Sequence, residues 1–232
     1  ILVNLPSSGA ITQGDEVGVL DVLYNAGIAN ELFPLLLFIG IGAMIDFGPL
    51  LQNPKLLIFG AAAQFGVFAV VVLATLLGFD LHDAASIGVI GAADGPTAIF
   101  VSQWFNSRYT GAIMVAAYSY MALVPIIQPP VIKALTTKKE RTIRMRYQAA
   151  NVSRLTRILF PIVVTVVAGL IVPRSVALVG FLMFGNLLRE CGVLDSLSHV
   201  AQNVLANLIT IFLGITIASQ MQADQFLNKE TW

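Results

Sequence analysis

An aspartate interrupts an apolar stretch of this sequence, GAADGPTAIF at residues 91–100. If the stretch lies in a membrane, an ionised Asp94 costs roughly 2.5–3.5 kcal/mol on insertion scales, so it has to be paired, protonated or bound to a cation. The nearest basic residue in the sequence is Arg108, which lies outside the stretch. A cation or a proton is therefore the expected partner of the Asp94 carboxylate.

Glycine and proline around Asp94 predict a broken helix. Gly91, Gly95 and Pro96 disfavour a continuous helix, and the helix that ends at IGVIG leaves its last carbonyls unpaired. Those oxygens, Gly91 among them, form with Asp94 and the Thr97 hydroxyl a hard oxygen site suited to sodium or another small cation. The alternative is that Asp94 only caps a helix starting at Pro96. A cap alone does not explain a carboxylate in an apolar run, which favours the cation site.

A second set of candidate residues is uncharged. The run AAYSYMALVP carries Tyr118, Ser119 and Tyr120, whose side chains point about 100° apart on a helix, so the three cannot all face one site. A tyrosine hydroxyl beside a carboxylate is a candidate proton donor, and a place in the interfacial aromatic belt is the alternative role. Asn186 is a further candidate sodium ligand, although a hydrogen bond between helices is the commoner role of such a residue.

Cysteine and histidine are too sparse to predict a transition-metal or redox centre. Cys191 is the only cysteine, which excludes a disulfide framework and a thiolate metal site. His82 and His199 are far apart in the sequence and lack metal-ligand spacing. Asp46, in MIDFGPLL, also precedes a Gly-Pro pair and is interpreted as a cap near the membrane edge.

The composition predicts that membrane-spanning helices position these residues. The chain is 57% hydrophobic and only 11% charged, unlike an ordinary globular domain. Residues 56–79 and 110–132 are uncharged and exceed the roughly 20 residues that cross a hydrocarbon core. Because no β-barrel alternation is present, the predicted fold is all-α, a polytopic membrane protein with a broken or re-entrant helix. Further apolar runs lie at 32–45, 158–173, 175–188 and 196–223.

The positive charges are concentrated in one loop. From Lys133 to Arg157 there are eight Lys or Arg and one acid, Glu140, whereas residues 1–54 contain no basic residue. The positive-inside rule therefore places this loop in the cytoplasm. A nucleic-acid partner is not expected, because the cluster lies between two spans and lacks interleaved aromatic residues beyond Tyr147.

The same rule favours a re-entrant arrangement of residues 84–105. If this segment crosses the membrane, Lys55 lies outside; if it enters and returns on one side, Lys55 joins the cytoplasmic charges. The predicted organisation is an extramembrane loop at 1–30, membrane helices at 31–132 with the re-entrant segment at 84–105, a basic cytoplasmic loop at 133–157 and further membrane helices at 158–232. Within the last part, the amphipathic residues 192–205 are expected at the membrane interface.

Seven blocks of the sequence resemble a known family. They are GAMIDFGPLLQNPK, GAAAQFG, GAADGPTAIF, AAYSYMALVPIIQPP, KKERTIRM, FGNLLRECGV and AQNVLANLITIFLG, spread from about residue 40 to 223. Together they are similar to the β subunit of the sodium-pumping, biotin-dependent decarboxylases, which act on oxaloacetate, methylmalonyl-CoA or glutaconyl-CoA. The blocks ADGPTAIF and AYSYMALVP are specific for that family in combination.

The resemblance implies a function and two residue roles. In that family the β subunit decarboxylates carboxybiotin, delivered by a carrier subunit, and uses the released free energy to export sodium. Asp94 would be the sodium-binding aspartate of the re-entrant segment, alternating between sodium and a proton. Tyr120 would supply the proton for decarboxylation. Asp94 and Tyr120 are therefore the expected catalytic residues, and sodium and carboxybiotin the expected ligands.

The resemblance also implies partners and a location. They are an α subunit with the carboxyltransferase and biotin carrier, a small membrane γ subunit, two further copies in a homotrimer, and the bacterial cytoplasmic (inner) membrane. The family chain continues into a second, inversely related half, whose Asn- and Ser-bearing broken helix completes the ion site. This chain starts at Ile1 without Met and stops at Trp232, so we expect it to be incomplete at both ends, with one half or more of an inverted-repeat, transporter-like fold.

Two other functions are compatible with the same residues. A secondary ion-coupled transporter would share the broken helices and inverted repeats but would need no biotinylated carrier. A scaffold subunit would tolerate loss of Asp94 but not neutralisation of the basic residues at 133–157. The carboxylated substrate is not encoded in this chain, because in the resembling family a separate subunit selects it.

Overall fold

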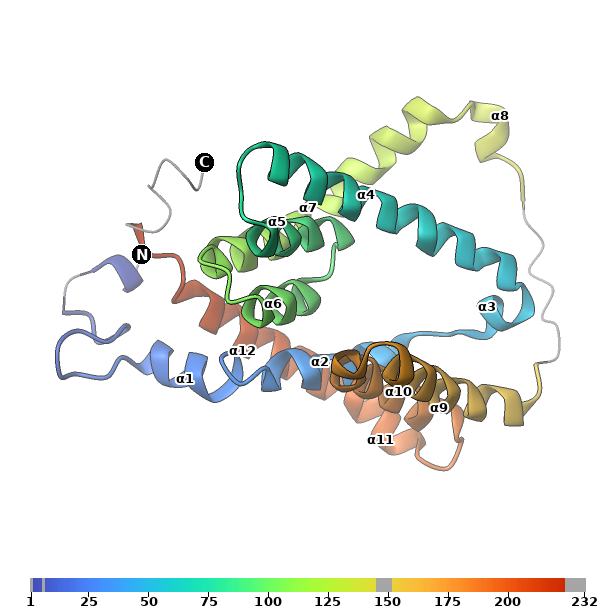
Figure 1. The fold of residues 1–232 in the computed structure, drawn as a ribbon. Helices are drawn as coiled ribbons and strands as arrows, with labels where there is room; N and C mark the ends of the chain where they lie inside the picture. The colour runs from blue at the N-terminus through green and yellow to red at the C-terminus, as the bar shows by residue number, and fades with distance from the viewer. Residues whose placement is uncertain (1, 6, 145–151, 224–232) are drawn as a thin grey trace.

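Helices make up almost all of the structure, a computed structural model that describes residues 2–5, 7–144 and 152–223 (Figure 1). In these ranges the one β-type pairing is an isolated bridge between Gln13 and Glu16, so the all-α prediction is confirmed. The elements are η1 (Leu2–Asn4), α1 (Val19–Gly27), α2 (Leu32–Met44), α3 (Gly48–Gln52), η2 (Pro54–Leu56), α4 (Leu57–Leu76), α5 (Leu81–Gly88), η3 (Val89–Ala92), α6 (Gly95–Trp104), α7 (Thr110–Leu135), α8 (Lys138–Arg141), α9 (Arg154–Ile171), η4 (Pro173–Ser175), α10 (Val176–Glu190), α11 (Asp195–Val200), the π-helical turn η5 (Ala201–Leu205) and α12 (Ala206–Ala218).

Several of these helices are candidate membrane spans. Helices α1 and α2 form a pair bent by 60° that is apolar enough to count as one broken span. Along α4, Phe59, Phe65 and Leu76 are 69%, 77% and 78% exposed, so this helix offers an apolar surface to lipid or to other chains. The chain is therefore a multi-pass membrane protein. Among the described residues, the four single helices long and apolar enough to cross are Pro54–Leu76, Thr110–Leu135, Arg154–Ile171 and Asp195–Ala218.

Glycines allow α2 and α10 to pack backbone against backbone. A Cβ built on Gly42 would lie 1.8 Å from the Leu182 carbonyl oxygen, and one built on Gly185 would lie 2.0 Å from the Ile39 carbonyl oxygen. Small residues of this kind are the usual means of close helix approach in membranes. No larger side chain fits at Gly42 or Gly185 without moving the helices apart.

A buried apolar cluster anchors the segment that follows Asp94. It joins Phe33 and Leu37 of α2, Ile99 of α6, Met114 of α7 and Leu213 of α12. Ile99, Met114 and Leu213 are fully buried. Helix α6 is therefore held between α2, α7 and α12, and its N-terminus is fixed relative to these longer helices.

Side-chain contacts show which helix ends lie together. Arg157, near the start of α9, forms an ion pair of 3.8 Å with Glu190 at the end of α10. Beyond the other end of α9, the Arg174 guanidinium lies over the Trp104 ring, 4.0 Å from its centroid. The basic segment before α9 and the C-terminal end of α6 are consequently at opposite ends of the helix array.

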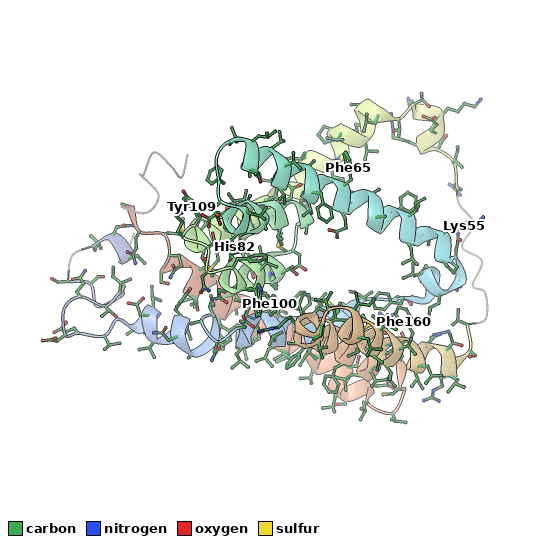
Figure 2. All side chains as sticks on the ribbon, in the orientation of Figure 1. Lys55, Phe65, His82, Phe100, Tyr109 and Phe160 are labelled. Carbon is green, nitrogen blue, oxygen red and sulfur yellow. The ribbon has the colours of Figure 1, made fainter. Side chains whose placement is uncertain are left out.

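The side-chain view shows the same two ends. Lys55, at the start of the long helix α4, lies at one end of the molecule with α8, whereas His82 and Tyr109 lie toward the other (Figures 1 and 2). We call these the basic end and the hairpin end. The first and last described segments of the chain also meet, because the Asn4 side chain donates to the Met221 carbonyl at 3.0 Å.

Part of the expected organisation differs from the structure. Residues 192–205 were predicted to lie at the membrane interface before a last span. In the structure α11 continues through the π-helical turn into α12, and the whole of Asp195–Ala218 is one candidate span. The physical reason is that its small and polar residues are covered by other helices: Ser198 and Ala201 are 5% and 4% exposed.

Parts of the predicted loops are helical in the structure. Of the loop predicted at 133–157, the structure has the end of α7, α8 and the start of α9, while 145–151 lie outside the described residues. The end of the segment predicted at 158–232, residues 224–232, is likewise outside them. The loop predicted at 1–30 contains α1. The inverted repeat stays a prediction.

Candidate functional site

The segment around Asp94 folds into a helical hairpin. Helix α5 and the turn η3 lead in, the chain turns at Asp94, and α6 leads out. The two feet of the hairpin meet, because the Ser107 hydroxyl donates to the Asp83 carboxylate at 2.7 Å. The Phe79 and Tyr109 rings also pack edge to face there, with centroids 5.6 Å apart. The segment therefore starts and finishes at the same end of the molecule.

The break at the tip of the hairpin has a local cause. Ala93 lies in the left-handed region with φ of 54°, a conformation that costs a residue with a Cβ roughly 1–2 kcal/mol. Asp94 is extended, with φ of −128° and ψ of 98°, and Pro96 occupies the first turn of α6. Proline is tolerated there because its missing N–H would have no helical partner. The broken helix predicted around Asp94 is confirmed.

Thr97 engages both oxygens of the Asp94 carboxylate. Its backbone N–H donates to Oδ1 at 3.3 Å and its hydroxyl donates to Oδ2 at 2.5 Å. Asp94 is thus the N-cap of α6, as the capping alternative predicted. Capping and cation binding are compatible, because each carboxylate oxygen and the hydroxyl oxygen keep lone pairs that can face a cation.

Tyr118 is the tyrosine that the fold brings beside this carboxylate. A Cβ built on Gly95, the residue after Asp94, would lie 2.6 Å from two carbons of the Tyr118 ring, so the ring lies directly on the Gly95 backbone. The Tyr118 hydroxyl is buried and makes no hydrogen bond with the described residues. Tyr118 therefore offers a free hydroxyl next to the candidate cation site.

Tyr120 occupies a different face of α7. Two residues after Tyr118, it points about 200° further round the helix, and it is 38% exposed. The structure therefore does not bring Tyr120 and Tyr118 onto one surface, as the helical spacing predicted. A proton-donor role for Tyr120 stays a prediction of the family resemblance.

Of the two further candidate ligands, only Gly91 lies at the hairpin tip. It closes η3 with Ala92, so its backbone carbonyl is near the break, and its Cα faces Val67 of α4. Asn186 is 1% exposed in α10 and donates to the Gly42 carbonyl at 3.3 Å and the Ile45 carbonyl at 3.0 Å. These bonds are the helix–helix role named as the alternative, and none of the described interactions joins Asn186 to Asp94.

The donor set at the tip suits a single monovalent cation. It comprises the Asp94 carboxylate and the Thr97 hydroxyl, which are in contact, and the backbone carbonyls at the end of η3 are the further hard oxygen donors nearby in the sequence. In the part of the chain that the structure describes, no three His, Cys, Asp or Glu residues are grouped to hold a metal ion. This chemistry matches sodium better than a divalent or transition metal.

A cavity between α9 and α10 does not fit carboxybiotin. Its volume is 240 Å³ and its lining is almost entirely apolar. The one hydroxyl in the lining, of Thr165, already donates to the Pro161 carbonyl at 2.8 Å. A ureido ring bearing a carboxylate needs several polar partners, so this cavity gives no place for it. The lining residues are Pro161, Ile162, Thr165, Val166, Gly180, Met183, Phe184 and Leu187.

Sequence reasoning missed one polar group of the hairpin. Asp83 was not among the predicted site residues, but it is 5% exposed and bridges to Ser107 and to the Arg108 guanidinium, whose Nε lies 3.0 Å away. The available signal was that an acidic residue, Asp83, and a basic residue, Arg108, flank the segment at 84–105 in the sequence. The contact of Asp83 with Ser107 and Arg108 could not be predicted, because the residues are far apart in the sequence.

Comparison with known proteins places the chain among membrane decarboxylase subunits. A family model described as Na+-transporting oxaloacetate decarboxylase beta subunit matches residues 1–232. The chain is 50% identical over 228 residues to the oxaloacetate decarboxylase beta chain of Klebsiella pneumoniae, covering 96% of this chain and 52% of that protein. It is 52% identical over 231 residues to the methylmalonyl-CoA decarboxylase subunit beta of Veillonella parvula, covering 100% and 60%.

A third relative shows a similar identity and coverage. The methylmalonyl-CoA decarboxylase subunit beta of Propionigenium modestum is 53% identical over 220 residues, which cover 94% of this chain and 52% of that protein. The chain thus spans about half the length of the curated relatives that it matches. On the strength of the match along its whole length, the chain belongs to the family of Na+-transporting oxaloacetate decarboxylase beta subunits.

Proposed function

We propose that this chain carries sodium-binding residues of a membrane subunit that couples decarboxylation to sodium export. The observation that supports the proposal best is the Asp94–Thr97 pair at the tip of a hairpin between apolar helices. A carboxylate in that position needs a partner, and no basic side chain among the described residues forms an ion pair with Asp94. Sodium or a proton supplies the missing positive charge.

In the proposed cycle the hairpin tip holds sodium in one state and a proton in the other. Asp94 supplies the charge, Thr97 orients the carboxylate and adds a hydroxyl oxygen, and the carbonyls near Gly91 complete the donors from this chain. The hairpin supports a re-entrant segment, because its two feet are in contact: Ser107 with Asp83, and the Tyr109 ring with the Phe79 ring. Its tip is then the part that enters the membrane, and the cation is bound in a low-dielectric region.

The two tyrosines receive separate roles. Tyr120 supplies a proton for decarboxylation, as the family resemblance implies. Tyr118 donates its buried hydroxyl to the Asp94 carboxylate or to the water around the cation, as its position on Gly95 indicates. Asn186 is left to hold α2 and α10 together. Carboxybiotin, brought by a separate subunit, would supply the carboxyl group that is released as carbon dioxide.

The proposal extends to partners and location in general terms. We infer that an α subunit with carboxyltransferase and biotin carrier, a small γ subunit and further copies of this chain, forming a trimer, assemble around it in the bacterial cytoplasmic membrane. Relatives named for oxaloacetate and for methylmalonyl-CoA are similarly close, at 50% and 52–53% identity. The proposed substrate of the complex is therefore a carboxylated compound of this class, such as oxaloacetate or methylmalonyl-CoA, which loses its carboxyl group. The family match favours this function over a secondary transporter without chemistry.

The experiment that tests the proposal is substrate-driven sodium uptake by proteoliposomes that contain the full complex. Wild-type complex is expected to take up sodium as the substrate is decarboxylated, and Asp94→Asn to lose this uptake. Asp80→Asn is the matched control, because Asp80 is an exposed cap on the same hairpin whose role Asn can fill. Uptake by Asp94→Asn at the wild-type rate would refute the proposal. Uptake without decarboxylation would favour the secondary transporter.

A further inference from the structure

A buried ionic bridge closes the feet of the hairpin. The Asp83 side chain is 7% exposed, and both of its oxygens are engaged: Oδ1 accepts from the Ser107 hydroxyl at 2.7 Å and Oδ2 accepts from Arg108 Nε at 3.0 Å. Ser107 also accepts from the Tyr109 N–H at 3.2 Å. We call Asp83, Ser107 and Arg108 the foot clamp. It joins residues that are distant in sequence and belong to opposite legs of the hairpin.

The clamp is asymmetric in its exposure to solvent. Asp83 is nearly buried, whereas the Arg108 side chain is 67% exposed. Taking a carboxylate out of water is unfavourable unless it is paired and hydrogen-bonded. The arrangement therefore favours one relative position of the two legs, the one in which Arg108 and Ser107 both reach Asp83. The stacked rings of His82 and Phe105, with centroids 5.1 Å apart, also join the two legs and favour the same relative position.

Both legs are helical from the feet to the tip, which is how the position of the feet can affect the tip in the proposal below. From Asp83, α5 and η3 run without a break to Ala92, and Gly88 packs so closely on α4 that a Cβ would lie 2.4 Å from a Val71 methyl. From Asp94, α6 runs to Trp104, and the Ser107 N–H still bonds the Ser102 carbonyl at 2.9 Å. A shift of one foot therefore moves one side of the Asp94 break relative to the other.

We propose that Asp83 is a positioning residue for sodium binding, which acts through the foot clamp on the geometry of Asp94 and Thr97. This inference depends on the proposed function, because the quantity it affects is the sodium affinity of the hairpin tip. The carboxylate of Asp83 itself contacts no sodium in this proposal. A clamp that only stabilised the fold would change the amount of intact complex and leave the sodium affinity of the surviving complex unchanged.

The test is the sodium dependence of decarboxylation by the full complex in proteoliposomes. Asp83→Asn and Arg108→Ala are expected to raise the sodium concentration for half-maximal activity roughly tenfold, the effect of losing one charge-assisted bond. The maximal rate per complex is expected to change much less. Arg108→Lys is expected to restore most of the affinity, and Asp80→Asn, an exposed carboxylate in the same turn, to leave it at the wild-type value.

If Asp83→Asn or Arg108→Ala prevents assembly of the complex, a milder variant and a structural measurement still test the inference. Ser107→Ala removes one hydrogen bond without leaving a charge unpaired, and it is expected to raise the half-maximal sodium concentration a few-fold. In hydrogen–deuterium exchange on the purified complex, Arg108→Ala is expected to speed exchange in 84–94 while α10 exchanges at the wild-type rate. This readout does not depend on activity.

The outcomes separate this inference from the proposed function. If wild-type activity depends on sodium and Asp94→Asn abolishes it, but all clamp variants keep the wild-type sodium affinity, the positioning role is refuted and the proposed function stands. If wild-type activity shows no sodium dependence, the proposed function fails, and with it the role assigned to Asp83. Exchange in 84–94 at the wild-type rate in Arg108→Ala would also contradict the clamp.

Discussion

Thr97 fixes the orientation of the Asp94 carboxylate. Two donors of one residue reach the two carboxylate oxygens, at 3.3 Å from the backbone and 2.5 Å from the hydroxyl. The residue types and their spacing predicted this pairing, because an Asp three residues before a Thr at a Gly-Pro break is typical of an N-cap. What the pairing adds to the cation proposal is a hydroxyl oxygen held next to the charge.

Two substitutions of Thr97 distinguish the contribution of its hydroxyl from that of the rest of its side chain. Thr97→Val keeps the shape and the backbone bond to Asp94 but removes the hydroxyl, so we expect the sodium concentration for half-maximal decarboxylation to rise roughly tenfold. Thr97→Ser keeps the hydroxyl and is expected to remain within about twofold of wild type. The measurement is a sodium titration of the reconstituted complex. Equal sodium affinity in the Val and Ser variants would contradict the hydroxyl's role.

Which of Tyr118 and Tyr120 faces Asp94 depends on the rotation of α7 about its axis, and the sequence does not specify this rotation. Both belong to the same apolar span, and only packing against α6 shows that Tyr118 lies on Gly95 while Tyr120 is 38% exposed. The sequence could predict that the two face different ways, from the angle between them. It could not predict which one faces Asp94.

The two tyrosine variants are expected to affect different kinetic quantities. Tyr118→Phe removes a hydroxyl beside the cation site, so we expect a rise of several-fold in half-maximal sodium concentration with little change in maximal rate. Tyr120→Phe removes the proposed proton donor, so we expect the maximal rate to fall about a hundredfold. Sodium titrations at saturating substrate measure both. If Tyr118→Phe alone reduced the maximal rate, the two assignments would have to be exchanged.

The hairpin from α5 to α6 was predictable at its tip but not at its feet. Glycine and proline mark the break directly in the sequence, whereas the contacts of Asp83 with Ser107 and Arg108 join residues on opposite legs. Similarly, hydropathy located the long spans, but it did not show that Asp195–Ala218 is one helix. Amphipathic residues can face neighbouring helices as well as the membrane interface, and the sequence pattern is the same in both cases.

Close packing of α2 on α10 makes a prediction about stability. Gly42→Ala places a Cβ 1.8 Å from the Leu182 carbonyl oxygen, so the helices must separate, and we expect a loss of about 1–3 kcal/mol in stability. Gly60→Ala is the control, because nothing lies within 4 Å of its added Cβ in α4. It is expected to be neutral or stabilising by up to about 1 kcal/mol. Thermal unfolding of the purified complex compares them, and an equal effect of both variants would contradict the packing described.

Most of the described basic residues lie at one end of the protein. Among the described residues, Arg108 and Arg174 are the basic residues at the hairpin end, where Arg174 lies over Trp104. The positive-inside rule therefore assigns the basic end to the cytoplasm. The sequence predicted this orientation from the loop charges. The structure adds only that Arg157 and Arg174 lie at opposite ends of α9, and the orientation stays a prediction. The described basic residues of the other end are Lys55, Lys133, Lys138, Lys139, Arg141, Arg144, Arg154, Arg157 and Arg189.

Cysteine labelling tests this orientation and the re-entrant hairpin together. In a background with Cys191→Ser, cysteine is introduced at His82, at Asn106 and at Lys139. We expect a membrane-impermeant maleimide to label the first two from the outer side of intact cells, and Lys139→Cys only after permeabilisation. His82 is the discriminating position, because its side chain is 65% exposed and lies at the first foot of the hairpin. Labelling at His82 and Asn106 from opposite sides would mean that the segment crosses the membrane.

Direct binding of sodium to the purified complex tests the role of Asp94 independently of catalysis. Equilibrium binding of radioactive sodium is measured for the wild type, for Asp94→Asn and for Asp80→Asn, each purified as the intact complex. We expect saturable binding in the wild type and in Asp80→Asn. In Asp94→Asn this binding is expected to be lost, because the only carboxylate at the hairpin tip is gone. Saturable sodium binding by Asp94→Asn with wild-type affinity would contradict the assignment of Asp94 as the sodium ligand.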